Sequence, residues 1–272
     1  MHPIGVFDSG VGGLSVLRAL HAELPFEQFV YVADSGHAPY GERDDAHIIT
    51  RSHAIANYLV QQHAIKALVV ACNTATAAAI QHLRQRHPLL PIIGIEPALK
   101  PAAVLSKTGR IGVMATRGTL GSEKFNTLLN TLKDQADFVL QPCDGLADAI
   151  ERDDASKIQS ISRQCMHAMG SFGNAPGQID TLVLGCTHYP FVQPLLQALA
   201  GQPIQCLEGG APVARQTRRV LAERGQLATE NLPLPLPPFN LQVFSTGNGA
   251  TLIPSIQQWM HLNFAVHPIT IT

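Results

Sequence analysis

The chain is short of charge, of aromatic residues and of long apolar runs. Only 14% of its 272 residues are charged and 6% are aromatic, while 46% are hydrophobic and the formal net charge is −1. This composition is too apolar for an intrinsically disordered chain, and it lacks the excess of Lys and Arg that binds a nucleic-acid backbone. No apolar run reaches the ~20 residues of a membrane-spanning helix. We therefore expect a folded protein that neither crosses a membrane nor binds nucleic acid.

Cysteine pairs at metal-binding or redox spacing are also missing. Five cysteines are present, none of them in a Cys-x-x-Cys motif: Cys72, Cys143, Cys165, Cys186 and Cys206. Zinc and thioredoxin-like chemistry are therefore disfavoured. The first residues, MHPIGVFDSG, show neither the basic region nor the apolar region of a signal peptide. We expect a cytoplasmic protein with free thiols and no metal, because a reducing compartment and an odd cysteine count disfavour disulfides.

Short apolar runs alternate with longer amphipathic segments. Residues 4–7, 29–33, 67–71 and 91–95 are predicted to be buried strands, and the segments between them carry apolar residues at helical spacing. Continuous apolar strands separated by helices are typical of parallel α/β proteins, which bind ligands at the carboxyl ends of their strands.

The second half of the chain echoes the first. IGVFDSGVG (4–12) resembles IGVMATRGT (111–119), QFVYVADSG (28–36) resembles DFVLQPCDG (137–145), and ALVVACNTA (67–75) resembles TLVLGCTHY (181–189). Three echoes in the same order indicate an internal duplication. We expect two similar α/β domains with mostly parallel sheets flanked by helices, related by a pseudo-twofold axis. The predicted ranges are 1–97 plus 209–272 and 98–208, with 232–238 (LPLPLPP) an extended connector and 241–272 completing the first sheet.

Two cysteines occupy matching positions in these halves. Cys72 follows the strand-like run LVVA and Cys186 follows LVLG, and each precedes small polar residues. A cysteine there lies beside the next helix N-terminus, where backbone N–H groups favour a thiolate or a bound anion. A lone buried cysteine usually only packs, but two in matching positions indicate a shared site. The flanks of Cys143, Cys165 and Cys206 predict packing.

Other polar residues also stand at predicted strand ends. Asp8 and Ser9 open a glycine-rich turn that lacks the third glycine of a dinucleotide loop, because Ser15 occupies its place. The turn is typical of close approach to a small anionic ligand, although Asp8 could equally be a cap. Further candidates at strand ends and turns are Asp34, Tyr40, Gly41, Asn73, Thr74, Thr187 and His188.

Two facing thiols without a metal or dinucleotide are suited to moving one proton across a carbon. One thiolate removes the proton from one face, and one thiol returns a proton to the other, each within ~3–3.5 Å of the carbon. The sulfurs would then stand roughly 7 Å apart, too far for a disulfide.

The segments FDSGVGGLSVL, ADSGHAPYGER, ACNTATAAAI, GIEPALKPA and LGCTHYPFV together closely resemble the cofactor-independent Asp/Glu racemase family, and glutamate racemases in particular. The resemblance extends from about residue 4 to residue 219. It implies two similar α/β domains with the active site in the cleft between them. It also implies racemisation of L- and D-glutamate without a cofactor, supply of D-glutamate for peptidoglycan, and a homodimer.

By this resemblance Cys72 acts on the D-isomer and Cys186 on the L-isomer. Asp8 and His188 would assist catalysis, and Asp34 and Glu151 would support the site. The matching substrate positions are Asp8, Ser9, Tyr40, Gly41, Asn73, Thr74, Thr187 and His188. The chain departs from the family's usual pattern in ADSGHAPYG and in LEGG (207–210), neither of which includes a reactive cysteine.

Two alternatives stay open, a sister racemase and a binding protein, and a pyridoxal-phosphate enzyme is disfavoured. A sister enzyme such as an aspartate racemase would use the same thiol chemistry in a pocket of different depth. A pyridoxal-phosphate racemase needs a Schiff-base lysine, and Lys100 has no phosphate-binding sequence near it. A two-lobed binding protein would share the architecture but would not need paired cysteines.

Overall fold

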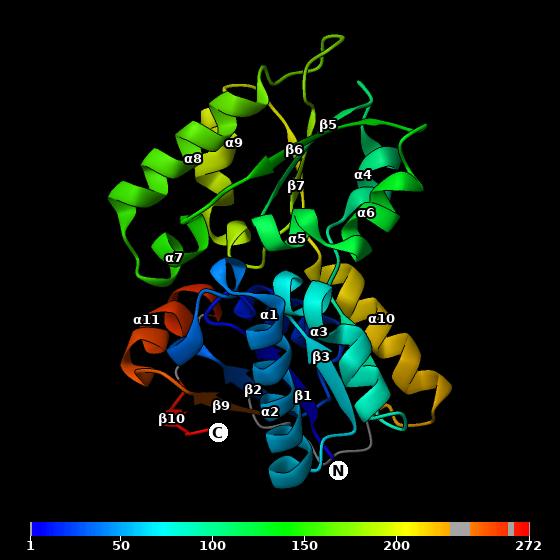
Figure 1. The fold of residues 1–272 in the computed structure, drawn as a ribbon, viewed down its shortest axis with the longest axis vertical. Coiled ribbons are helices and arrows are strands. Elements are labelled where there is room, and N and C mark those ends of the chain that lie inside the picture. Colours follow the sequence, from blue (N-terminus) through cyan, green and yellow to red (C-terminus); the bar gives the residue numbers. More distant parts are fainter. Residues whose placement is uncertain (1, 229–239, 261–263, 272) are drawn as a thin grey trace. The chain divides into compact units, whose positions relative to one another are not determined.

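The computed structural model describes residues 2–228, 240–260 and 264–271 (Figure 1). The chain forms two compact units, 1–95 with 210–272 and 96–209. The boundaries expected from the sequence lie within a few residues of these, and the division into independent domains stays a prediction. The expected connector at 232–238 lies outside the described residues. Over the described ranges, no helix has the length and apolar character to cross a membrane.

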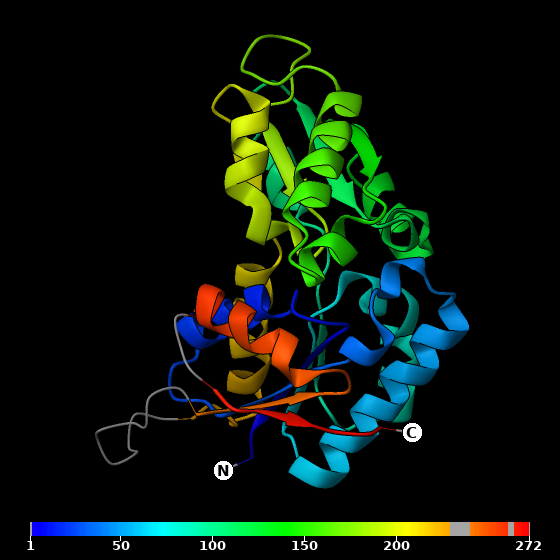
Figure 2. The same cartoon turned by 90° about the vertical axis from the view of Figure 1, so that its left-hand side faces the viewer.

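The first unit contains a six-stranded parallel sheet in the order β10-β9-β2-β1-β3-β4. Its strands are β1 (Ile4–Asp8), β2 (Phe29–Ala33), β3 (Ala67–Val70), β4 (Ile92–Gly94), β9 (Leu241–Ser245) and β10 (Val266–Pro268). The predicted strands are confirmed to within a residue or two. The C-terminal segment does join this sheet, because β9 pairs with β2 and β10 pairs with β9 (Figure 2).

Helices cover both faces of this sheet. They are α1 (Leu14–Glu23), α2 (Asp45–His63), α3 (Asn73–Arg86), α10 (Gly210–Glu223) and α11 (Gly249–Met260), with short 3-10 helices η1 (Ser35–His37) and η2 (Tyr40–Glu42). α2 and α3 pack together over one face, and α1 packs with α10 and α11 over the other (Figures 1 and 2). Asp44 caps the N-terminus of α2, because its carboxylate accepts the His47 N–H at 2.7 Å.

The second unit contains a four-stranded parallel sheet in the order β6-β5-β7-β8. Its strands are β5 (Arg110–Ala115), β6 (Asp137–Pro142), β7 (Thr181–Leu184) and β8 (Gln205–Leu207). Its helices are α4 (Leu99–Leu105), α5 (Arg117–Gly121), α6 (Glu123–Asn130), α7 (Leu146–Glu151), α8 (Ala155–Met169) and α9 (Gln193–Ala200), with the 3-10 helix η3 (Tyr189–Val192). α4 and α6 contribute to one apolar cluster with β5 and β7, while α8 packs with α7 and α9.

The two sheets repeat one another. The order β2-β1-β3-β4 in the first unit matches β6-β5-β7-β8 in the second. The three sequence echoes begin on the corresponding strands, β1 with β5, β2 with β6 and β3 with β7. The expectation of two similar α/β units with parallel sheets is therefore confirmed, and each of the two candidate cysteines follows the corresponding strand, β3 or β7.

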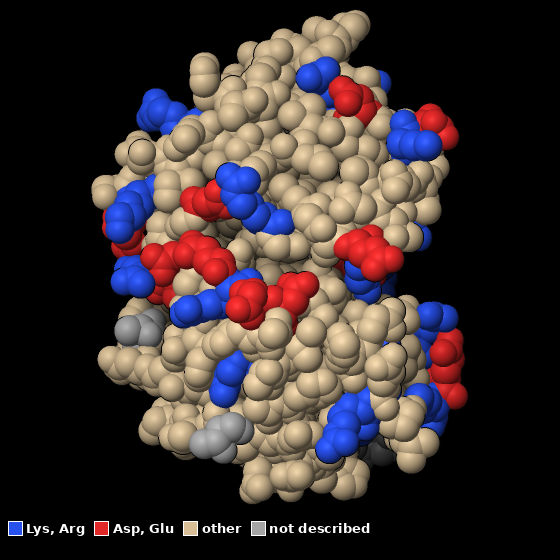
Figure 3. Space-filling view, in the orientation of Figure 1, with Lys and Arg blue, Asp and Glu red and all other residues tan. Residues whose placement is uncertain are grey.

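Charge is spread thinly over the surface, in keeping with the composition. On the face drawn in Figure 3, acidic and basic side chains are interspersed among a majority of uncharged residues. Exposed ion pairs such as Arg219–Glu223 and Arg117–Asp144 mix the two signs locally. That face shows no continuous stripe of basic side chains of the kind that binds a polyanion.

Candidate active site: two cysteines at matching strand ends

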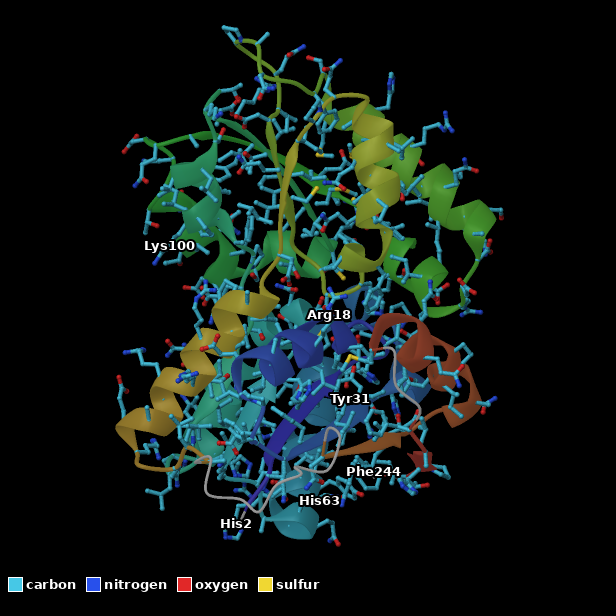
Figure 4. All side chains as sticks on the ribbon, turned by 180° about the vertical axis from the view of Figure 1, so that it is seen from behind. His2, Arg18, Tyr31, His63, Lys100 and Phe244 are labelled. Atoms are coloured by element: carbon cyan, nitrogen blue, oxygen red, sulfur yellow. The ribbon has the colours of Figure 1, made fainter. Side chains whose placement is uncertain are left out.

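The turn after β1 is built around the buried carboxylate of Asp8. Its Oδ1 accepts the N–H of Gly10 at 2.9 Å, and the Tyr31 hydroxyl of β2 (Figure 4) donates to the Gly10 carbonyl at 2.6 Å. A Cβ on Gly13 would lie 2.6 Å from Asp8 Cβ and 2.7 Å from the Tyr31 hydroxyl. The glycine-rich turn is therefore required by close packing over Asp8, since a side chain at Gly13 would displace it.

Cys72 lies just beyond β3 and caps the N-terminus of α3. Its side chain is 5% exposed. The sulfur accepts the N–H of Ala75 at 3.4 Å, and the thiol donates to the Ser9 hydroxyl at 3.9 Å. A thiolate at this position would be stabilised by the positive end of the helix dipole and by the Ala75 N–H.

The first turn of α3 places two further polar side chains beside this thiol. Asn73 and Thr74 are both 5% exposed. Within the described part of the chain, the Asn73 Oδ1 atom has no hydrogen-bond partner. A buried acceptor without a partner costs free energy, so a ligand that donates a hydrogen bond here, such as an ammonium group, would be stabilised.

Tyr40 and Asp34 form a second buried polar group in the same unit. The Tyr40 hydroxyl donates to Asp34 Oδ2, and Tyr40 shares an apolar cluster with Cys72. Burial and the neighbouring Asp34 charge hold the pKa of Tyr40 well above its usual range, so its hydroxyl keeps its proton. Gly41, half-buried, follows in η2.

Cys186 occupies the matching position in the second unit. It follows β7, is 7% exposed, and its sulfur lies 3.7 Å from Nδ1 of His188. Gly185, directly before Cys186, packs closely against the end of β5, because a Cβ there would lie 2.9 Å from the Met114 carbonyl oxygen. Thr187, between the cysteine and the histidine, is buried.

His188 links the second thiol to a carboxylate. Its Nε2 lies 2.9 Å from Oε2 of Glu151, which ends α7. Burial alone would lower the pKa of His188, but hydrogen bonds with Cys186 and Glu151 outweigh burial and raise it well above its usual value. A protonated imidazole beside Cys186 would favour the thiolate form of that sulfur.

The remaining cysteines have structural surroundings, as their flanks predict. Cys143 and Cys165 are both buried, and their thiols are hydrogen bonded, which together with burial raises the pKa of Cys143. Cys206 is half-buried, and burial raises its pKa to about 11. Lys100 stands exposed in the first turn of α4 (Figure 4). Among the described residues, no cluster of three or more His, Cys, Asp or Glu is arranged to hold a metal ion.

The structure thus gathers the predicted site residues into two groups, one in each unit. In the first unit they lie at and just beyond the carboxyl ends of β1, β2 and β3: Asp8, Ser9, Asp34, Tyr40, Gly41, Cys72, Asn73 and Thr74. In the second unit they lie beyond β7 and at the end of α7: Glu151, Cys186, Thr187 and His188.

Sequence reasoning missed two residues that complete the first group, Arg51 and Thr246, which both donate to Asp34. The sequence does contain a signal for Arg51, because this charged residue lies on the apolar face of α2 between Ile48 and Ile55, where a buried partner is needed. Thr246 carried none, since it follows β9, more than two hundred residues away.

Comparison with known proteins agrees with this architecture. Residues 4–217 match the model of the family described as Asp/Glu/Hydantoin racemase. The chain is 50% identical to a glutamate racemase of Stutzerimonas stutzeri over 228 residues, 84% of each chain. It is 47% identical to one from Pseudomonas aeruginosa over 234 residues, covering 85% of this chain and 86% of the relative.

Solved structures give the same result over nearly the whole chain. The glutamate racemase isoform RacE1 from Bacillus anthracis superposes with a TM-score of 0.84 at 30% identity, covering 99% of this chain and 98% of the other. An Escherichia coli glutamate racemase, solved with L-glutamate and the activator UDP-MurNAc-ala, gives a TM-score of 0.81 at 28% identity over 100% of both chains. From its matched residues, its relatives and its paired strand-end cysteines, the chain belongs to the Asp/Glu/hydantoin racemase family.

Proposed function

We propose that this protein interconverts L-glutamate and D-glutamate without a cofactor, using Cys72 and Cys186 as a pair of acid and base groups. The observation that carries the proposal is the repetition of one arrangement. In each unit a buried thiol follows the corresponding strand, with hydrogen-bonding groups beside it. The glutamate racemases to which the chain is about half identical support glutamate as the substrate.

The reaction transfers one proton on each face of the α-carbon. With L-glutamate bound, the Cys186 thiolate takes the α-proton, so that the C–H bond breaks and an S–H bond forms. The electron pair left on carbon is delocalised into the α-carboxylate. The Cys72 thiol then gives its proton to the opposite face, which leaves D-glutamate and a Cys72 thiolate. The reverse direction begins at Cys72.

This chemistry places a geometric demand on the two sulfurs. Each must approach the α-carbon to ~3–3.5 Å from opposite faces, so that the two are roughly 7 Å apart when substrate is bound. Exclusion of water around the carbon would lower the cost of the carbanion by replacing solvent with fixed dipoles. The burial of both thiols is in keeping with this demand.

The polar neighbours of each thiol have distinct proposed roles. His188, protonated and held by Glu151, would keep Cys186 ready as the base for the L-isomer. Asp8 would assist Cys72 from the neighbouring strand end. The residues proposed to bind the amino and carboxylate groups of the substrate are Asp8, Ser9, Tyr40, Gly41, Asn73, Thr74, Thr187 and His188.

We also propose the cellular setting that the family resemblance implies. The protein would act in the cytoplasm as a homodimer, and its D-glutamate would enter peptidoglycan. The relatives named above are bacterial proteins, which is consistent with a role in a bacterial cell wall.

The direct test follows the circular dichroism of an L-glutamate solution after adding the purified protein, in buffer containing a chelator and no pyridoxal phosphate. We expect the signal to decay to zero as the racemic mixture forms. L-Aspartate is assayed in parallel, because the family includes aspartate racemases. A stable L-glutamate signal with a decaying L-aspartate signal would overturn the substrate assignment, and activity only after adding a cofactor would overturn the mechanism.

A further inference from the structure

Arg51 is a buried cation on a helix that contributes no predicted site residue. It lies on the apolar face of α2, where it is 7% exposed. Its guanidinium holds Asp34 in a bidentate pair, with Nε to Oδ2 at 3.0 Å and Nη2 to Oδ1 at 2.8 Å. Nη1 donates to the Ile271 carbonyl at 2.7 Å. One side chain therefore connects the end of β2 to the C-terminal segment.

Asp34 in turn contacts three other side chains, those of Tyr40, Thr246 and His37, and the Nδ1 atom of His37 lies 3.2 Å from Oδ1. The Tyr40 hydroxyl donates to Oδ2, and the Thr246 hydroxyl donates to Oδ1 at 2.7 Å. The Thr246 oxygen also accepts the N–H of Gly36 at 3.2 Å, so it holds the turn between Asp34 and Tyr40 as well. The carboxylate of Asp34 is thus surrounded by hydrogen-bonding partners from α2, η1, η2 and the loop after β9.

This arrangement fixes the orientation of the Tyr40 hydroxyl. Buried ion pairs contribute little net stability, because desolvation of both charges offsets their attraction. A bidentate guanidinium instead fixes a carboxylate in one plane, and that carboxylate fixes the Tyr40 hydroxyl. Burial alone would raise the pKa of Asp34, but its bonds to Arg51, Tyr40 and Thr246 hold the pKa below its usual range, so the carboxylate stays ionised.

We propose that Arg51 and Thr246 are positioning residues, which act through Asp34 to orient Tyr40 for binding the amino-acid substrate. The inference rests on the proposed racemase function, in which Tyr40 contacts the substrate beside Cys72. The inference also gives the C-terminal segment a role in the site. The Ile271 carbonyl accepts a hydrogen bond from Arg51, and the Thr246 hydroxyl donates one to Asp34. Neither Arg51 nor Thr246 touches the reacting atoms.

The test measures KM and kcat for L-glutamate in Arg51→Lys and Thr246→Val. Lysine keeps the charge but cannot form the bidentate pair, and valine keeps the shape of threonine without its hydroxyl. We expect KM to rise about tenfold for Arg51→Lys and about fivefold for Thr246→Val, with kcat within about threefold of the unmodified protein. Arg84→Lys is the matched control, because Arg84 on α3 also donates to a backbone carbonyl, that of Ile92, and should leave KM unchanged.

A double-mutant cycle separates positioning from general stability. If Arg51 acts through the Tyr40 hydroxyl, Arg51→Lys should raise KM by less than twofold in a Tyr40→Phe background. An equal rise in both backgrounds, or an unchanged KM with a lowered melting temperature, would overturn the inference. If Arg51→Lys does not fold, the same test is made with Thr246→Val, by comparing its effect on KM in the unmodified and the Tyr40→Phe backgrounds. An unmodified protein that does not racemise glutamate would instead refute the proposed function.

Discussion

Cys72 and Cys186 differ from Cys143 and Cys165 in their neighbours and not in their burial. Cys143 and Cys165 are free and buried as deeply, but the Cys143 thiol donates to the backbone carbonyl of Gln141 at 3.5 Å. Cys72 instead meets a helix N-terminus, and Cys186 meets an imidazole. At the scale of residues, the two reactive thiols are distinguished by groups that can stabilise a thiolate.

Replacing either thiol should abolish racemisation while the fold survives. We expect Cys72→Ser and Cys186→Ser each to lower kcat by about 10²- to 10⁴-fold, since a hydroxyl is a far weaker acid and base at neutral pH. Serine is a good N-cap, so α3 should keep its capped end in Cys72→Ser. Far-ultraviolet circular dichroism checks the fold, with Cys206→Ser as the control that should retain activity. Racemisation retained in either strand-end variant would contradict the assignment of that thiol.

The His188–Glu151 pair should give the protein a pH-dependent stability. A histidine whose pKa is raised by folding stabilises the native state fully below about pH 6.5, its unfolded value. This contribution is lost as pH rises through the higher native pKa. Glu151→Gln should therefore lower the free energy of unfolding by about 1–3 kcal/mol at pH 5.5 and by less at higher pH.

Urea denaturation of both proteins at pH 5.5, 7 and 8.5 measures this difference. A deficit in Glu151→Gln that grows with pH would show that His188 is not the stabilised cation. Arg152→Gln serves as a control, because the Arg152–Asp148 pair is exposed and should give a small, nearly constant difference.

At the scale of elements, the site depends on how tightly each strand end packs against the following turn. Gly13 and Gly185 stand where a Cβ would collide with Asp8 or with the Met114 carbonyl. The backbone at Gly13 has ordinary helical angles, φ −61° and ψ −13°. Glycine is therefore needed there for space and not for an unusual conformation.

Gly13→Ala should damage the first group of site residues by displacing Asp8. The added methyl must push on Asp8 or Tyr31, so we expect a loss of about 1–3 kcal/mol in stability and a fall in activity of at least about tenfold. Gly121→Ala, at the end of α5 with nothing within 4 Å of a new Cβ, is the matched control and should be neutral or slightly stabilising. Thermal unfolding and the racemisation assay together check both variants, and equal effects would contradict the packing argument.

The periodicity of apolar residues was sufficient to predict the strands of the first sheet and the positions of the two strand-end cysteines. Apolar runs predicted β1 to β4, because burial leaves a local signal in the sequence. The ends of β1, β3 and β4 differed slightly from the predicted ranges, as expected where a strand continues into a loop. The bonds from Arg51 and Thr246 to Asp34 could not be predicted, since they join segments that only the folded sheet brings together.

At the scale of the whole molecule, the chain repeats one four-strand pattern in two units. The sequence echoes predicted this repetition because corresponding strands need similar apolar runs. Each unit supplies one thiol at the matching strand end, and neither unit alone contains both. The proposed function therefore requires one substrate to engage residues of both units.

Substrate binding should stabilise the whole chain. A ligand at one hundred times its dissociation constant adds about 2.7 kcal/mol to the free energy of unfolding, so D- or L-glutamate should raise the melting temperature by several degrees. A chelator should change neither the melting temperature nor the activity. L-Aspartate should give a smaller shift than glutamate, and a larger one would favour the aspartate alternative.

The central claim is that two thiols act on opposite faces of the α-carbon, and early-stage deuterium incorporation tests it most directly. The protein is given L-glutamate in D2O, and nuclear magnetic resonance with chiral separation measures the label at the α-carbon at low conversion. Two bases predict that newly formed D-glutamate carries deuterium from the Cys72 thiol while recovered L-glutamate remains unlabelled. Product that retains the original proton, or equal early labelling of both isomers, would contradict the two-thiol mechanism.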